Sequence, residues 1–250
     1  MKTLEICAVG LSGALNAQQA GAHRIELCEN LESGGLTPSY GTLKTIRSLV
    51  HIPMHVLIRP RRGDYVYDPA YIDIMLNDIK MVKSLGYEGI VTGALDRLGS
   101  LDIDAMQKLL KAARPMKVTF HRAVDVAYDP MQLIQQLIDM GIERVLTSGG
   151  MPTAIQGLKA ITAMQKAFGD KIAIMAGSGI NSSNVLEILS DTGVNEIHLS
   201  AKTKVFSQMN PVTKVQKQSE LIAEPHWWWY DVDGAEVEKI IKLMGQAYGV

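Results

Sequence analysis

Short apolar runs alternate with helical patterns along the whole chain. The run at 4–9 precedes a helical pattern that Gly21 would end as a C-cap. The run at 54–59 leads to Asp68-Pro69, where proline at the first helical position predicts a long helix. The predicted strands are 4–9, 24–28, 54–59, 89–93, 117–121, 144–147, 171–176 and 196–200, and the predicted helices are 12–20, 40–49, 69–85, 103–113, 130–140, 153–168, 184–190 (after Ser182 or Ser183 as cap) and 234–248.

Eight strand–helix units in 250 residues predict a single (β/α)8 TIM barrel. The predicted strands are almost continuously apolar, as parallel strands covered on both sides are. A doubly wound open sheet is the alternative, but the sequence after the first strand, Gly10-Leu11-Ser12-Gly13, is a poor dinucleotide fingerprint. We find no linker that divides the chain, and therefore expect one domain over residues 1–250.

One segment departs from this alternation. Residues 202–225 form a polar insertion before the last helix, and it leads into Trp227-Trp228-Trp229-Tyr230. Four successive aromatic side chains cannot all face one core. Aromatic residues are enriched at protein interfaces, so the cluster predicts either a subunit contact or a loop folded over the barrel end.

Composition excludes several classes of function. The 25 Lys and Arg residues balance 26 Asp and Glu, which argues against a nucleic-acid footprint or a polybasic membrane patch. No apolar stretch is long enough to predict a membrane span, and the N-terminus lacks the apolar core of a signal peptide. Two cysteines make no disulfide framework, so we expect the reducing cytoplasm.

Polar residues recur on one face of several predicted strands, and in a barrel the working residues lie at the C-terminal strand ends. Because side chains alternate along a strand, the polar members of each set share one face, which we predict points into the barrel. We expect Glu5, Glu26 and Arg59 to neutralise one another there. The sets are Glu5 with Cys7; Arg24, Glu26 and Cys28; His55 and Arg59; Thr119 and His121; and Glu196, His198 and Ser200.

This arrangement has two interpretations, a functional mouth and a purely structural polar network. In a functional mouth, His121 and His198 are acid–base candidates because histidine titrates near neutrality. Glu26 is a candidate base or metal ligand, Arg59 a candidate anion clamp, and Asp125 a group that orients His121 or Arg122.

A glycine-rich turn, Gly177-Ser178-Gly179, follows the seventh strand and precedes a helix. Its main-chain N–H groups predict an anion site, because phosphate sites of such barrels lie after strands seven and eight. A tight connection would also need these glycines. The further anion-binding candidates are Arg61, Asp64, Arg122, Asp125, Thr147 and Ser148.

Cys7 and Cys28 lie on neighbouring predicted strands with the same facing. Two converging thiolates favour a soft ion such as copper(I). The alternative is that both are buried small hydrophobic residues without a ligand.

At these residues the chain resembles the CutC family of copper homeostasis proteins. The resemblance implies a cytoplasmic (β/α)8 barrel associated with copper tolerance, a homodimer or larger oligomer, and Cys7 and Cys28 as candidate copper ligands. The other hypothesis is an enzyme acting on a small anionic or phosphorylated metabolite at the barrel mouth. The matching stretches are LEIC at 4–7, AHRIELC at 22–28, GGLTPS at 34–39, IRPRRGDYVY at 58–67, TFHRAVD at 119–125, RVLTSG at 144–149 and HLSA at 198–201, while the Trp227–Trp229 run matches no motif of the family.

Overall fold

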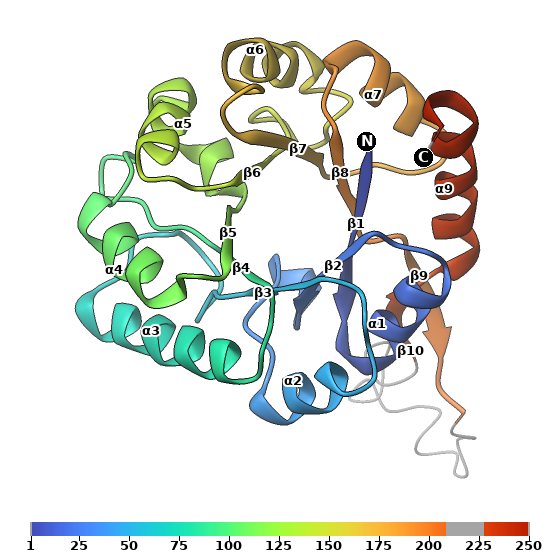
Figure 1. Cartoon of the computed structure of the whole chain (residues 1–250), viewed down its shortest axis with the longest axis horizontal. Helices are drawn as coiled ribbons and strands as arrows, with labels where there is room; N and C mark the ends of the chain where they lie inside the picture. Colours follow the sequence, from blue (N-terminus) through green and yellow to red (C-terminus); the bar gives the residue numbers. More distant parts are fainter. Residues whose placement is uncertain (1, 209–227, 250) are drawn as a thin grey trace, which may run out of the picture.

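Eight parallel strands close into a barrel in the computed structural model, which describes residues 2–208 and 228–249. Each strand pairs with its neighbours in sequence, and β1 closes the barrel by pairing with β8 (Figure 1). The predicted (β/α)8 barrel is therefore confirmed. The barrel strands are β1 (Thr3–Val9), β2 (Arg24–Cys28), β3 (Met54–Leu57), β4 (Gly89–Thr92), β5 (Lys117–Phe120), β6 (Arg144–Thr147), β7 (Ala173–Gly177) and β8 (Glu196–Leu199).

A ring of helices covers the outside of the barrel, with α9 between α7 and α1 (Figure 1). Asp68, Asp102 and Asp129 each accept a main-chain N–H in the first turn of the helix that follows, as N-caps do. The helices are α1 (Gly10–Gln19), α2 (Tyr40–Arg47), α3 (Pro69–Ser84), α4 (Ile103–Ala113), α5 (Pro130–Asp139), α6 (Leu158–Phe168), α7 (Val185–Thr192) and α9 (Gly234–Tyr248), with 3-10 turns η1 (Leu31–Ser33) and η2 (Arg122–Val126).

Several predicted boundaries differ from the structure, and two of these differences follow from a tertiary contact that takes the backbone. The third strand ends at Leu57, because the N–H of Arg59 bonds to Thr37 Oγ1. Helix α6 begins at Leu158 rather than near 153, since the N–H of Ala154 bonds to the carbonyl of Ser178. The N-cap of α7 is Asn184, not Ser182 or Ser183, and it makes no side-chain cap bond.

The predicted polar insertion forms, in its described part, one strand of an antiparallel pair. Strand β9 (Lys202–Phe206) pairs with β10 (Trp228–Val232), while residues 209–225 of the insertion and Trp227 lie outside the described residues. Lys204 lies over the ring of Trp228, 3.9 Å from its centroid, and Lys202 over that of Tyr230 at 4.6 Å. Trp229 is exposed. The predicted subunit contact stays a prediction.

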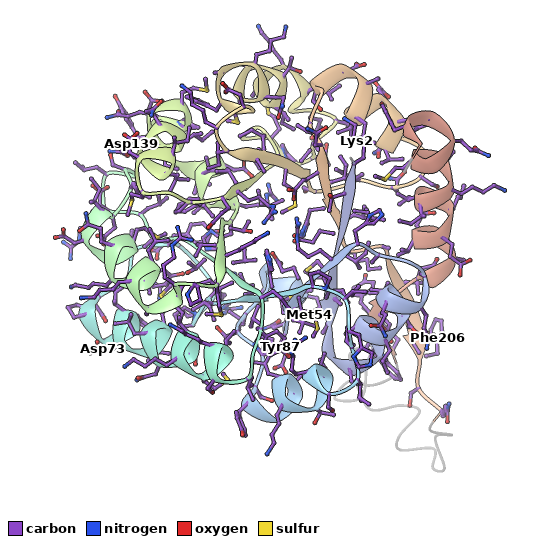
Figure 2. The ribbon with its side chains drawn as sticks, viewed as in Figure 1. Lys2, Met54, Asp73, Tyr87, Asp139 and Phe206 are labelled. Carbon is purple, nitrogen blue, oxygen red and sulfur yellow. The ribbon has the colours of Figure 1, made fainter. Side chains whose placement is uncertain are left out.

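Side chains alternate along each strand between the core outside the barrel, under the helices, and the interior of the barrel. Leu4, Ile6 and Ala8 of β1 belong to the large apolar core between strands and helices, whereas Cys7 belongs to a small cluster inside the barrel with Cys28, Leu57 and Val91. Figure 2 shows this layering: Met54 and Tyr87 lie inside the molecule, and Asp73 and Asp139 point outward from α3 and α5. The inner face is the one that carries the polar residues discussed next.

Candidate functional site

A cavity of about 900 Å³ opens at the C-terminal end of the barrel. Its wall includes the ends of β1, β2 and β8 on one side and the segments after β3, β5 and β7 on the other. Of the residues predicted as a site, those that line it are Cys7, Glu26, Cys28, Arg59, His121, Arg122, Asp125, Ser178, Gly179 and His198.

The two cysteines meet in this cavity. The Sγ atoms of Cys7 and Cys28 lie 3.4 Å apart, and the Cys7 thiol also donates to Glu26 Oε1 at 3.5 Å. The hydrogen bond with Cys28, together with burial, raises the pKa of the Cys7 thiol well above its ordinary value. Both thiols are reduced and buried, as predicted for converging side chains.

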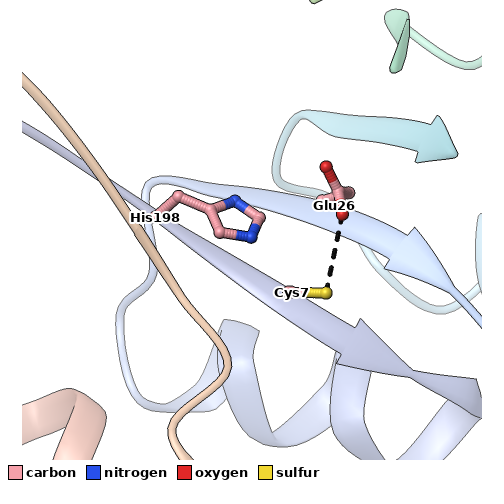
Figure 3. Close-up of side chains that lie close together, drawn as sticks. All are labelled: Cys7, Glu26 and His198. Carbon is pink, nitrogen blue, oxygen red and sulfur yellow. Dashed lines mark hydrogen bonds between the residues drawn. The ribbon is translucent and has the colours of Figure 1, made fainter. Parts of the chain in front are cut away.

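Glu26 is a buried carboxyl group whose second oxygen, Oε2, has no hydrogen-bond partner. Burial raises its pKa above the ordinary value. One ligand atom from each of Cys7, Glu26 and His198 lies within 4.8 Å of the others (Figure 3). These three side chains come from three neighbouring strands of the closed barrel, β1, β2 and β8.

Glu5 fixes the orientation of His198. The Nδ1 atom of His198 lies 2.8 Å from Glu5 Oε1, and this leaves Nε2 for the cavity side. Burial opposes the charge on His198, but Glu26 and Glu5 outweigh it and hold the pKa of the imidazole above its ordinary value. A carboxylate behind a histidine is the arrangement that orients imidazole ligands in metal sites.

Beneath the cavity lies a network of ion pairs inside the barrel. Arg24 pairs with both Glu5 and Glu196, and Arg144 binds Glu196 through Nε at 2.5 Å and Nη2 at 3.0 Å. Arg144 also donates to Thr119 Oγ1. The polar network of the second interpretation is thus present, and the functional mouth stays a prediction. Sequence reasoning missed Arg144, although its inward alternation at the start of β6 was a usable signal.

The expected neutralisation of Glu5 and Glu26 by Arg59 was wrong, because the backbone of the η1 loop takes the guanidinium. Arg59 donates to the carbonyls of Ser33 and Gly35 at 3.0 Å each and of Gly63 at 2.9 Å. Glu5 instead has Arg24 as its cation.

His121 lies across the cavity from the thiols. Its Nδ1 accepts the N–H of Ala123, and its Nε2 has no partner. Burial, with Arg59 nearby, lowers the pKa of His121 to about 3. The imidazole is therefore neutral near pH 7, and its proton sits on Nε2 because Nδ1 is an acceptor. The ring packs against Tyr65, with 4.6 Å between centroids.

Asp125 orients Arg122 rather than His121. Its carboxylate accepts from Arg122 Nε at 2.8 Å, from Thr147 Oγ1 at 2.5 Å and from the N–H groups of Ser148 and Gly150. Arg122 Nη2 reaches Ser148 Oγ at 2.7 Å. Four of the predicted anion-binding residues therefore form one connected group, in which Thr147 and Ser148 mainly hold Asp125.

The turn after β7 has a left-handed backbone, and its role as an anion site stays a prediction. Ser178 and Gly179 both have positive φ, 83° and 67°. Ser178 Oγ donates to the carbonyl of Pro152, and Gly177 belongs to β7, where it packs against His198. Ser178, Gly179 and Ile180 line the cavity, with Ser200 and Ala201 beyond β8.

Arg61 and Asp64 pair with each other outside the cavity wall. Arg61 Nη2 donates to Asp64 Oδ1 and to the carbonyl of Val66, both at 2.7 Å. The same guanidinium lies over the rings of Tyr67 and Tyr71. These contacts order the loop after β3, and direct ligand binding by Arg61 and Asp64 stays a prediction.

The fold and the site define a TIM-barrel protein with a cavity at its C-terminal mouth, a cysteine pair on one wall and a buried histidine opposite. The CutC family model matches residues 2–203. A family protein CutC of Xanthomonas campestris is 45% identical over 98% of this chain and 99% of its own length. One of Bacteroides thetaiotaomicron is 42% identical over 82% of this chain and 83% of its own length. The chain belongs to the CutC family.

Solved structures agree with this assignment. The CutC protein of Streptococcus agalactiae, whose name proposes a role in copper homeostasis, superposes with a TM-score of 0.77 at 34% identity, over 80% of this chain and 99% of its own. Phosphoribosyl anthranilate isomerase of Thermococcus kodakaraensis superposes with a TM-score of 0.61 at 13% identity, covering 98% of this chain and 99% of its own, and shares the fold alone. In the described part of the chain, no helix combines the length and apolar character needed to span a membrane.

Proposed function

We propose that this protein binds copper(I) on the wall of its cavity as part of copper homeostasis, with Cys7 and Cys28 as the primary ligands. The observation that carries the proposal is the 3.4 Å contact between the two sulfur atoms. Metal–sulfur bonds are about 2.3 Å long, so one ion can join sulfurs up to about 4.6 Å apart. The pair meets this condition, and soft thiolate ligands favour copper(I).

His198 and Glu26 supply the further ligands that such a site needs. Both offer an atom within 4.8 Å of Cys7 Sγ, and Glu26 Oε2 lacks any other partner. Imidazole binds copper well, and Glu5 holds the His198 ring from behind. The role in copper homeostasis proposed for the Streptococcus agalactiae relative supports the same assignment.

Copper(I) titration in competition with a chromogenic chelator, under anaerobic reducing conditions, tests the proposal. The double variant Cys7→Ser, Cys28→Ser should bind copper at least about 100-fold more weakly, because a hydroxyl is a poor ligand for a soft ion. Met106→Leu is the matched control, since it removes a buried sulfur outside the barrel. Equal copper affinity in the wild type and the double variant would contradict copper binding through Cys7 and Cys28.

An enzyme acting on a small anionic or phosphorylated metabolite is the second candidate. The specific observation in its favour is the cavity of about 900 Å³, far larger than one ion needs and within the range of small-molecule sites. The positive φ angles of Ser178 and Gly179 support an anion cradle on its wall. Candidate acid–base groups are Glu26, His121 and His198.

A further inference from the structure

Arg59 is a buried cation without a carboxylate. Its side chain lines the cavity, and the residue is 5% exposed. Its three hydrogen bonds all go to main-chain carbonyls, and none of the ion pairs in the described ranges 2–208 and 228–249 includes it. Burying a charge without a counter-charge is costly, so the site lacks a negative group.

The other two buried arginines show what Arg59 lacks. Arg24 reaches both Glu5 and Glu196, and Arg144 holds Glu196 through two nitrogens. These arginines share the barrel interior with Arg59, so the fold does supply carboxylates to buried guanidinium groups. Of the three buried arginines, only Arg59, on the cavity wall, has no carboxylate partner among the described residues.

Two nitrogen atoms in this region remain without a partner. They are Nε of Arg59 and Nε2 of His121, and each carries a proton to donate. The ring of Tyr65 packs against both groups, 5.3 Å from the Arg59 guanidinium carbon and 4.6 Å from the His121 ring centroid. Tyr65 also lines the cavity. An unused donor on the Arg59 guanidinium and a second one on His121 call for an acceptor that is negatively charged, because Arg59 has no ion-pair partner among the described residues.

We propose that the cavity binds a small organic anion whose carboxylate or phosphate group pairs with Arg59 and accepts from Nε2 of His121. Neither nitrogen has exposed surface, so side chains around the two groups have to move for the anion to reach them. The site is distinct from the thiol pair of the copper proposal. It names the residues that would bind the anionic group of the second candidate's substrate, and in that respect rests on that candidate function.

Binding is measured directly by isothermal titration at constant ionic strength, with inorganic phosphate, oxalate and 2-phosphoglycolate as probes. The wild type should bind at least one probe with 1:1 stoichiometry. Arg59→Gln should weaken that binding about 30-fold or more, as expected for lost hydrogen bonds to a charged group. Arg62→Gln, which removes an exposed arginine from the same loop, should bind like the wild type. Binding of oxalate without binding of inorganic phosphate would identify a carboxylate ligand, and binding of inorganic phosphate without binding of oxalate would identify a phosphate group.

Two results overturn the proposal: no probe binds the wild type, or Arg59→Gln and Arg62→Gln bind equally. Should Arg59→Gln fail to fold, His121→Phe keeps an aromatic ring beside Tyr65 and removes the donor, and about tenfold weaker binding is expected. A crystal structure of the wild type with the bound probe tests the location of the site independently. An anionic group bound away from Arg59 and His121 would exclude the proposed site. The titration measures binding and not turnover, so its failure would count against the anion site and leave copper binding untouched, which is read in a separate titration. A separate activity assay that found no turnover would count against the enzyme alone.

Discussion

The Nδ1 atom of His198 lies 2.8 Å from Oε1 of Glu5, although 193 positions separate the two residues in the sequence. This pair joins the first and the last strand of the closed barrel. It also links the ion network around Arg24 to the cavity that holds Cys7 and Glu26. Glu5 is fully buried, and Arg24 and His198 outweigh the effect of burial and hold its pKa well below the ordinary value.

Glu5→Gln should lower the free energy of unfolding by about 3–5 kcal/mol, because it removes the buried carboxylate that binds His198 and one of the two that bind Arg24. Urea denaturation at pH 7 measures the change. Arg47→Gln is the control, since it breaks the partly exposed pair with Glu88 and should cost less than about 1 kcal/mol. Similar losses in the two variants would show that the barrel network contributes no more than a surface pair.

His55 should make the protein sensitive to mild acid. Burial lowers the pKa of His55 to about 3 in the native state, against about 6.5 in the unfolded chain. Between these values the unfolded chain binds a proton that the native protein does not, so stability falls as the pH falls. From pH 7 to pH 5 this one group should cost about 2 kcal/mol.

The non-titrating variant His55→Gln isolates this contribution. Its free energy of unfolding should drop about 2 kcal/mol less than that of the wild type between pH 7 and pH 5, whatever its stability at pH 7. Urea titrations at the two pH values provide the comparison. Parallel pH dependences in both proteins would mean that His55 does not remain neutral in the fold.

Gly93 makes room for the His121 ring. A Cβ atom at Gly93 would lie 2.7 Å from Cε1 and 2.8 Å from Nδ1 of that ring. Gly93→Ala should therefore displace His121 and lower stability by about 1–3 kcal/mol. Gly41→Ala is the matched control: it lies in α2 with no atom nearer than 4.0 Å to the new Cβ, and should stabilise by about 0.5–1 kcal/mol. Thermal denaturation of both variants checks the prediction, and a neutral Gly93→Ala would contradict the tight packing.

Strand and helix spacing predicted the barrel because each unit carries its own local signals. Asp68-Pro69 and Asp129-Pro130 begin helices through hydrogen bonds within a few residues of the chain. The inward facing of Cys7, Glu26 and Cys28 followed from alternation alone, and the 3.4 Å sulfur contact agrees with it. Boundaries were wrong where distant groups take the backbone, as Thr37 does at Arg59.

The sequence by itself therefore determined the fold, the inward face of five strands and ten residues of the cavity wall, because period and capping are local properties. Only the tertiary structure decided which charges pair. The closure of β1 against β8 brings Glu5 to His198, and the pairing of β1 with β2 brings it to Arg24. Carbonyl groups of the η1 loop bind Arg59 instead. Partner choice depends on distances between segments far apart in the chain, and burial then fixes whether each group is charged.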